Sequence, residues 1–150
     1  MSLPSDANRR TLTDSLVDLY INLDRTYAAA SRDVRLTPQQ AQLLCVAEHE
    51  HPTLGRLAEA LGCDKTNITG LVDRAVKRGL VERCDDAQDR RVTRVEMTVE
   101  GRRLIARFHQ SLQRRLSGIR LGQGLVAADI DAISDQLGTA GDPPSGPPLP

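Results

Sequence analysis

Residues 53–79 read TLGRLAEALGCDKTNITGLVDRAVKRG, and this stretch decides the fold class. Its first part predicts a short amphipathic helix that has Thr53 as N-cap and ends at Gly62, a residue suited to the left-handed conformation. A second helix begins two or three residues later, with Asp64 as N-cap, and it ends at Gly79. Its buried face is predicted to carry Ile68, Leu71, Val72 and Ala75. Two short helices joined by so tight a turn predict a helix-turn-helix.

The opposite face of the second helix carries no large apolar side chain. In a helix-turn-helix such a face enters the major groove of DNA, and its first turns reach the base edges. We expect Thr66, Asn67 and Thr69, followed by the small Gly70, to face the bases there. Lys65 and Arg74 stand where phosphates would pass. Asp64, Thr66 and Asn67 are also good helix-starting residues, so helix capping remains an alternative role for them.

A β-hairpin is predicted directly after Gly79. Residues 80–83 and 92–97 read as strands, and residues 84–91 form a charged segment rich in turn-forming residues. The order helix, turn, helix, hairpin is that of a winged helix-turn-helix. Arg90 and Arg91 lie at the predicted tip of the wing, where an arginine is placed to enter a narrow minor groove. The alternative is that they are solvated loop charges.

Apolar stripes predict four further helices around this unit. They cover about residues 11–32, 38–49, 99–120 and 126–138. We therefore expect a mainly α-helical fold with a small wing of two to three strands. We expect residues 11–138 to form a single domain, with the winged helix-turn-helix at 37–98. The helices at 11–32 and 99–138 are expected to be dimerisation helices, because their apolar stripes exceed what a small winged domain can cover. Residues 1–10 are predicted to be flexible, and the proline-rich residues 139–150 to be a disordered tail.

Composition limits the function. The 150 residues carry 20 basic and 20 acidic side chains, so DNA contact requires a local arrangement of charge. No apolar run approaches the ~20 residues of a membrane span, and the first ten residues lack a signal-peptide pattern. We expect a cytoplasmic protein without a membrane partner, and three scattered reduced cysteines. No motif of catalytic residues appears, which argues against an enzyme, and no cofactor is predicted.

Several of these segments resemble the MarR (multiple-antibiotic-resistance regulator) family of winged helix-turn-helix transcriptional regulators. The resemblance covers residues 65–74, KTNITGLVDR, and residues 77–83, KRGLVER. It continues in Asp89-Arg90-Arg91 and in Met97-Thr98 with Gly101, and the Asp-x-Arg signature followed seven residues later by Thr is its most specific part. The order of helices extends the resemblance to about residues 11–138. Ala75 departs from the leucine that the family usually carries.

The resemblance implies a homodimeric, ligand-responsive repressor on a near-palindromic operator in double-stranded DNA. It implies that Asp73 pairs with Arg91 and orients the wing, while Arg91 enters the minor groove. It also implies a small aromatic or phenolic effector, bound between the dimerisation helices and the winged unit. Candidate wall residues are Tyr20, Tyr27, Leu44, His49 and Phe108, although an aromatic on an apolar stripe is more often part of a core.

Two alternatives remain open at the sequence level. A redox- or metal-responsive regulator would use Cys63, which lies near a helix N-terminus, or the pair Cys45 and His49, which are i and i+4 on one helix. The cysteine positions do not match the first-helix cysteine of peroxide-sensing members, and Cys45 with His49 lacks further ligands, so buried apolar roles are favoured. The other alternative is a winged-helix module that binds protein.

Overall fold

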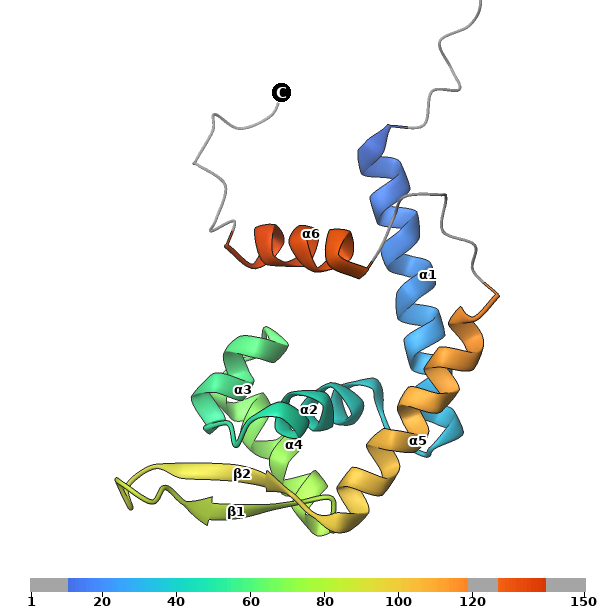
Figure 1. Cartoon of the computed structure of the whole chain (residues 1–150). Helices are drawn as coiled ribbons and strands as arrows, with labels where there is room; N and C mark the ends of the chain where they lie inside the picture. Colours follow the sequence, from blue (N-terminus) through green and yellow to red (C-terminus); the bar gives the residue numbers. More distant parts are fainter. Residues whose placement is uncertain (1–10, 119–126, 140–150) are drawn as a thin grey trace, which may run out of the picture. The chain divides into compact units, whose positions relative to one another are not determined.

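The structure, a computed structural model, describes residues 11–118 and 127–139, in two units that divide after Ser117. In these described residues, the first unit contains five helices and a hairpin, and the second contains one helix (Figure 1). The elements of the first unit are α1 (Leu12–Asp33), α2 (Pro38–His49), α3 (Leu54–Leu61), α4 (Lys65–Lys77), β1 (Val81–Asp85), β2 (Thr93–Met97) and α5 (Val99–Leu116). The second unit is α6 (Ala127–Thr139). The mainly helical fold class is confirmed, whereas the predictions for residues 1–10 and 140–150 lie outside the described residues.

The helices begin at the residues that capping chemistry predicts. The side chains of Thr37, Thr53, Asp64 and Thr98 each accept a hydrogen bond from the backbone N–H three positions on. Thr37 forms a full capping box with Gln40, as the sequence predicts. Gly62 ends α3 with a φ of 61°, in the left-handed region where a glycine is unstrained. These local signals fix the geometry of the turn between α3 and α4.

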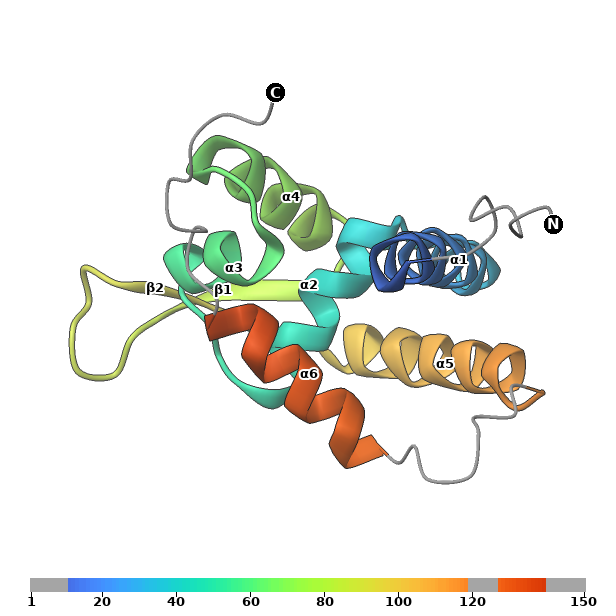
Figure 2. The ribbon, with the colours of Figure 1, turned by 90° about the horizontal axis from the view of Figure 1, so that it is seen from above.

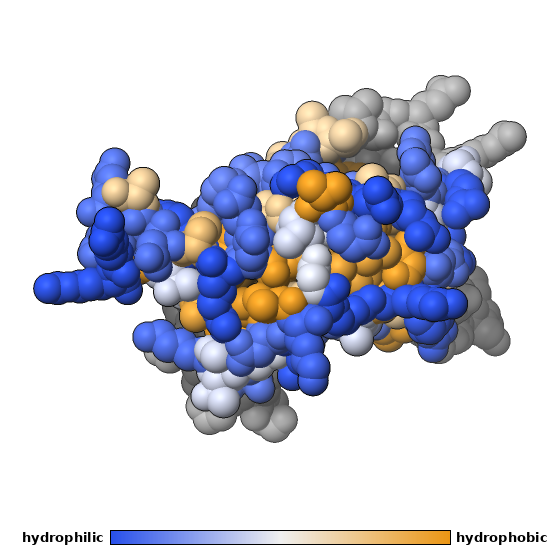
Figure 3. Space-filling model, turned by 90° about the horizontal axis from the view of Figure 1, so that it is seen from below, coloured by the Kyte–Doolittle hydropathy of each residue, from blue (hydrophilic) through white to orange (hydrophobic). Residues whose placement is uncertain are grey.

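A single apolar core joins α4 to the other helices of the first unit. The buried face of α4 is the predicted one, Ile68, Leu71, Val72 and Ala75. It packs with Leu43 and Leu44 of α2, Leu57 of α3 and Phe108 of α5. Helices α1 and α5 lie side by side (Figure 1, Figure 2). On the face seen from below, hydrophilic residues surround an apolar area (Figure 3). Buried contacts therefore hold the opposite, polar face of α4 outward.

The wing is an antiparallel hairpin in which Val81 pairs with Met97 and Asp85 pairs with Thr93. Its first strand starts one residue later than predicted. The segment before α3 adds a short third edge, because Thr53 bridges to Arg94 and Val95 N–H donates to the Pro52 carbonyl at 2.9 Å. The wing is thereby attached to the start of the helix-turn-helix.

Helix α1 leaves most of its apolar stripe uncovered in the single chain. Leu12, Leu16, Val17, Leu19, Tyr20, Ile21 and Leu23 are all exposed, and only Ala30 and Ser31 of this helix are buried. On α6, taken by itself, Ile130, Ile133 and Leu137 are exposed at helical spacing. Among the described helices, none is both long and apolar enough to cross a membrane.

Candidate nucleic-acid interface

The outward face of α4 is polar except for Val76 in its last turn, which is 37% exposed. Lys65, Thr66, Asn67, Thr69 and Arg74 are exposed, and Gly70 is half-buried among them. The side chain of Asn67 donates to Asp64 Oδ2 at 3.0 Å, while Asp64 Oδ1 accepts from the Asn67 N–H at 2.8 Å. Asn67 thus stabilises the first turn of α4. Its side-chain amide is exposed, so it can leave the Asp64 carboxylate and bind another hydrogen-bond partner.

The wing tip lies beside the first turns of α4. Arg91 lines the same hollow of about 510 Å³ as Lys65 and Thr69. The rest of its wall comes from the N-cap and first turn of α3 and from the chain that enters β2. These residues are Thr53, Leu54, Gly55, Val92 and Thr93. Arg90 is exposed next to Arg91. The structure therefore brings one wing arginine together with two of the predicted α4 residues.

Two aspartates order the wing tip. Asp86 Oδ1 accepts from the N–H groups of Gln88 and Asp89 at 2.8 and 3.1 Å, and Asp89 Oδ1 accepts from the Arg91 N–H at 3.0 Å. These side-chain bonds to the backbone fix the direction of the chain at Arg91. The Asp-x-Arg pattern thus has a structural role in this tip.

Arg94 connects the tip to the body of the molecule, a role that sequence reasoning missed. Its Nε forms an ion pair with Asp86 Oδ2, and its Nη1 donates to the His51 carbonyl at 2.8 Å. The Arg94 side chain and the N–H donors at the tip hold the pKa of Asp86 at about 2. Periodicity does not reveal this link, because Arg94 fits the strand pattern whether or not it is paired.

The predicted pair of Asp73 and Arg91 is wrong for this structure. Asp73 Oδ1 instead lies 2.7 Å from Arg83 Nη1, on β1. Asp73 is eight residues beyond Lys65, about 12 Å along the helix at 1.5 Å per residue, and thus near the base of the wing, while Arg91 stands beside Lys65. Asp73 therefore contacts the wing through β1. Both partners are partly exposed, so the pair contributes little stability, about 1 kcal/mol or less.

Replacement of Asp86 by asparagine is expected to lower the melting temperature at about pH 7 and to have almost no effect at about pH 2. The folded-state pKa of about 2 lies below the ordinary value of 3.8, so the stability it contributes is full above the ordinary value and is lost as pH falls through about 2. Thermal unfolding of both proteins across this range measures the difference. Asp85→Asn is the matched control, because that carboxylate has no ion-pair partner among the described residues. A difference that persists at low pH would contradict the link.

The five predicted wall residues of an effector site do not gather in one place. Tyr27 and Phe108 do meet, edge to face, with ring centroids 4.8 Å apart. Leu44 and Phe108 are fully buried in the core, whereas Tyr20 is 70% exposed on α1 and the His49 side chain is 82% exposed. The roles of Tyr20 and His49 in an effector site therefore stay predictions, since both side chains are exposed in the single chain.

Cys45 contacts a different histidine from the one in the metal-site alternative. Its Sγ lies 3.8 Å from His109 Nε2 on α5 and 3.8 Å from the Tyr27 hydroxyl, while His49 lies beside Glu48. Burial raises the pKa of the Cys45 thiol and that of the Tyr27 hydroxyl. Cys63 packs against the core. Within residues 11–118 and 127–139, no three His, Cys, Asp or Glu side chains are arranged to hold a metal ion.

Comparison with known proteins identifies the fold. Residues 36–93 match the model of the MarR family. Over 83 residues the chain is 32% identical to the HTH-type transcriptional regulator YfiV of Bacillus subtilis, a match that covers 53% of this chain and 52% of YfiV. The matched part thus spans about half the length of that relative. The family match covers α2, the helix-turn-helix and β1.

Solved structures extend the likeness beyond the family match. CouR from Rhodococcus jostii RHA1, bound to p-coumaroyl-CoA, superposes with a TM-score of 0.74 at 25% identity, over 89% of this chain and 93% of CouR. A point mutant of MepR from S. aureus, bound to an oligodeoxyribonucleotide, gives 0.60 at 17% identity, over 86% and 94% of the two chains. The likeness in fold therefore extends beyond residues 36–93.

Proposed function

We propose that this chain is a homodimeric transcriptional regulator of the MarR type that reads double-stranded DNA with α4 and its wing. The observation that carries the proposal is the outward polar face of α4 with Arg91 in the same hollow as Lys65 and Thr69. Such a surface allows a helix to enter the major groove while an arginine enters the neighbouring minor groove. MepR, which has the same fold, was solved bound to an oligodeoxyribonucleotide.

The uncovered face of α1 supports the dimer. Seven large apolar side chains on one helix are more than a soluble monomer ordinarily exposes in one place. A second copy of the chain buries them with twofold symmetry, and α6 carries a further apolar stripe. Two copies of α4 would then stand about one DNA turn, ~34 Å, apart and read a near-palindrome.

A small aromatic effector is the proposed signal, with repression as its proposed output. Tyr27 and Phe108 join α1 to α5 next to the core that supports α4, so a ligand that displaces these rings would shift the position of α4. CouR, similar over most of the chain, was solved with an aromatic acyl-CoA. Tyr27 with Phe108 is the part of the predicted wall that supports this assignment.

Arg91→Ala is expected to weaken binding to the preferred DNA site while dimerisation and melting temperature stay nearly unchanged. Arg91 is exposed at the wing tip, so its side chain carries little folding energy. Random duplex DNA is first selected with the purified protein, and the recovered site is then titrated with both proteins across a salt series. Arg103→Ala, an exposed arginine on α5, is the control.

The selection itself tests the proposed function. A near-palindrome that the wild-type protein retains and Arg91→Ala loses supports a dimeric DNA reader. Equal affinity of the two proteins at matched salt would remove the wing from the interface. Failure to enrich any sequence, in the presence and absence of aromatic acids, would favour a winged helix that binds protein.

Asn67→Ala is expected to cost about 1–3 kcal/mol on the selected site and little on random DNA, as for a side chain that reads a base. The loss of its bond to Asp64 lowers folding stability by only about 1 kcal/mol or less, because that bond is exposed. Lys65→Ala is the matched comparison, since a phosphate contact is lost on both kinds of DNA. If Asn67→Ala loses the same affinity on both DNAs, Asn67 contacts the phosphate backbone of the DNA and does not read a base.

A further inference from the structure

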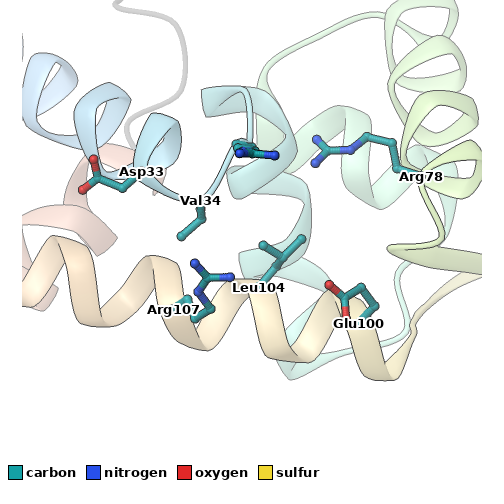
Figure 4. Close-up of a pocket in the computed structure, with 7 residues that line it drawn as sticks. Asp33, Val34, Arg78, Glu100, Leu104 and Arg107 are labelled. Atoms are coloured by element: carbon teal, nitrogen blue, oxygen red, sulfur yellow. The ribbon is translucent and has the colours of Figure 1, made fainter.

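A polar hollow of about 500 Å³ lies where the turn between α1 and α2, the end of α4 and the first half of α5 meet (Figure 4). It is separate from the hollow beside Arg91 and from the rings of Tyr27 and Phe108. Three arginines reach it, Arg35, Arg78 and Arg107, one from each of these segments. Val34 and Leu104, both buried, supply its apolar wall.

The two carboxylates on its wall are occupied by other partners. Asp33 Oδ2 accepts from Ser111 Oγ at 2.5 Å and from Arg115 Nη2 at 2.7 Å, and these bonds lower the pKa of Asp33. Glu100 Oε2 lies 3.4 Å from Arg103 Nη1. Arg115 and Arg103 both lie outside the hollow. The carboxylates are therefore engaged with cations that do not belong to the three-arginine group.

Two of the three arginines have no partner among the residues that the structure describes. The guanidinium groups of Arg35 and Arg107 form no hydrogen bond or ion pair with any residue in the described part of the chain. Arg78 uses Nη1 to donate to Gln40 Oε1 at 2.7 Å and keeps its other N–H donors. Three like charges around one hollow repel one another, and a bound anion would remove that repulsion.

The backbone conformation of Arg35 also supports an anion site in this hollow. Its φ of 58° is in the left-handed region, and Arg35 is the non-glycine residue in the described chain with a positive φ. Glycine adopts this conformation without strain, whereas an arginine does so at a cost. The backbone therefore favours glycine here, and the guanidinium is the feature that an arginine adds.

We propose that this hollow binds a multiply charged oxyanion, the phosphate or polycarboxylate group of a small-molecule effector. The planar guanidinium fork matches either group with paired hydrogen bonds, and the volume suits a small ligand. Arg78 is the C-cap of α4, so an anion shared by Arg35, Arg78 and Arg107 links the DNA-reading helix to α5 and to the turn before α2. This regulatory consequence rests on the proposed function, whereas the binding site itself does not.

Calorimetric titration of the full chain with pyrophosphate, and separately with citrate, tests the site in a phosphate-free buffer of constant ionic strength. We expect saturable binding of one anion per chain. Arg107→Gln should weaken it by about tenfold or more, because a charge-assisted bond is lost. Arg114→Gln, two turns further along α5 and outside the hollow, should bind as the wild-type chain does. Saturation by one probe alone identifies the group as phosphate or polycarboxylate.

Arg35→Gly separates binding from folding. This variant should bind the anion at least about tenfold more weakly and yet melt no lower than the wild-type protein, since glycine relieves the left-handed backbone. The proposal is overturned if neither probe saturates the wild-type chain, or if Arg35→Gly and Arg107→Gln both bind the anion with unchanged affinity.

These titrations contain no DNA, so the two proposals fail separately. A chain that binds pyrophosphate or citrate but enriches no duplex keeps the anion site and loses the proposed function. A chain that reads a palindrome but takes neither probe keeps the function and loses the site. If both proposals hold, the bound anion should change the affinity of the wild-type chain for its selected DNA. The affinity of Arg107→Gln for that DNA should stay unchanged when the anion is added.

Discussion

Replacement of Gly101 by alanine is expected to lower the free energy of unfolding by about 3 kcal/mol or more. A Cβ at this position would stand 2.1 Å from the Leu80 carbonyl oxygen and 2.6 Å from Met97 Cγ. The first contact is with backbone that also accepts the Thr98 N–H at 3.1 Å, so it cannot move without breaking the base of the wing. Denaturant unfolding at one fixed protein concentration measures the effect.

Gly55→Ala is the matched control for this substitution. Gly55 is also helical, but a Cβ there meets only Thr53 Oγ1, at the ordinary distance of 3.8 Å. Alanine in place of a helical glycine should therefore be neutral or stabilise the protein by up to about 1 kcal/mol. If the two variants shift the unfolding midpoint alike, the close approach of α5 to Leu80 does not control stability.

Phe108→Ala is expected to lower the free energy of unfolding by about 3–5 kcal/mol, because it removes a whole aromatic ring from a packed core. The ring is fully buried where α1, α2 and α5 meet, and it packs edge to face on Tyr27. Removal leaves a cavity at the centre of the support for α4. Denaturant unfolding gives the loss of stability, and DNA titration of the fraction that remains folded shows whether α4 is still held in position.

Tyr27→Phe provides the comparison for that loss. It keeps the ring and removes only a hydroxyl whose neighbour, Cys45 Sγ, is 3.8 Å away, so the cost should be about 1 kcal/mol or less. A Phe108→Ala protein as stable as Tyr27→Phe would mean that the core around α4 is not formed by this ring pair.

Local signals made the helix-turn-helix predictable. Thr53, Gly62 and Asp64 each act within about one helical turn of their own position, so the sequence contains the whole cause of the start or stop that they specify. The end of α5 had no such signal: the apolar stripe predicts a helix to about Arg120, and the structure describes it to Leu116. An apolar stripe indicates which face is buried and does not indicate where a helix ends.

The site depends on contacts that spacing does not encode. The partner of Asp73 is set by the register of β1, and the histidine that meets Cys45 comes from α5, far along the chain. Arg35, Arg78 and Arg107 lie on three separate segments, and the left-handed backbone of Arg35 contradicts residue preference. Residue spacing in the sequence predicts contacts within one helix or one hairpin. The contacts of Asp73 and Cys45 and the group of three arginines form only when several elements pack together.

The hydrogen bonds of Thr98 allow the tip of the wing to vary in length during evolution. Its Oγ1 reaches the carbonyls of Gly79 and Leu80 at 2.6 and 3.0 Å and accepts the Gly101 N–H at 3.0 Å, so both ends of the hairpin are fastened at one point. Lengthening a loop with fixed ends costs only about 0.6 kcal/mol per doubling. Insertions at the tip can therefore accumulate without disturbing α4, and the two parts of the proposed DNA-reading surface are free to diverge at different rates.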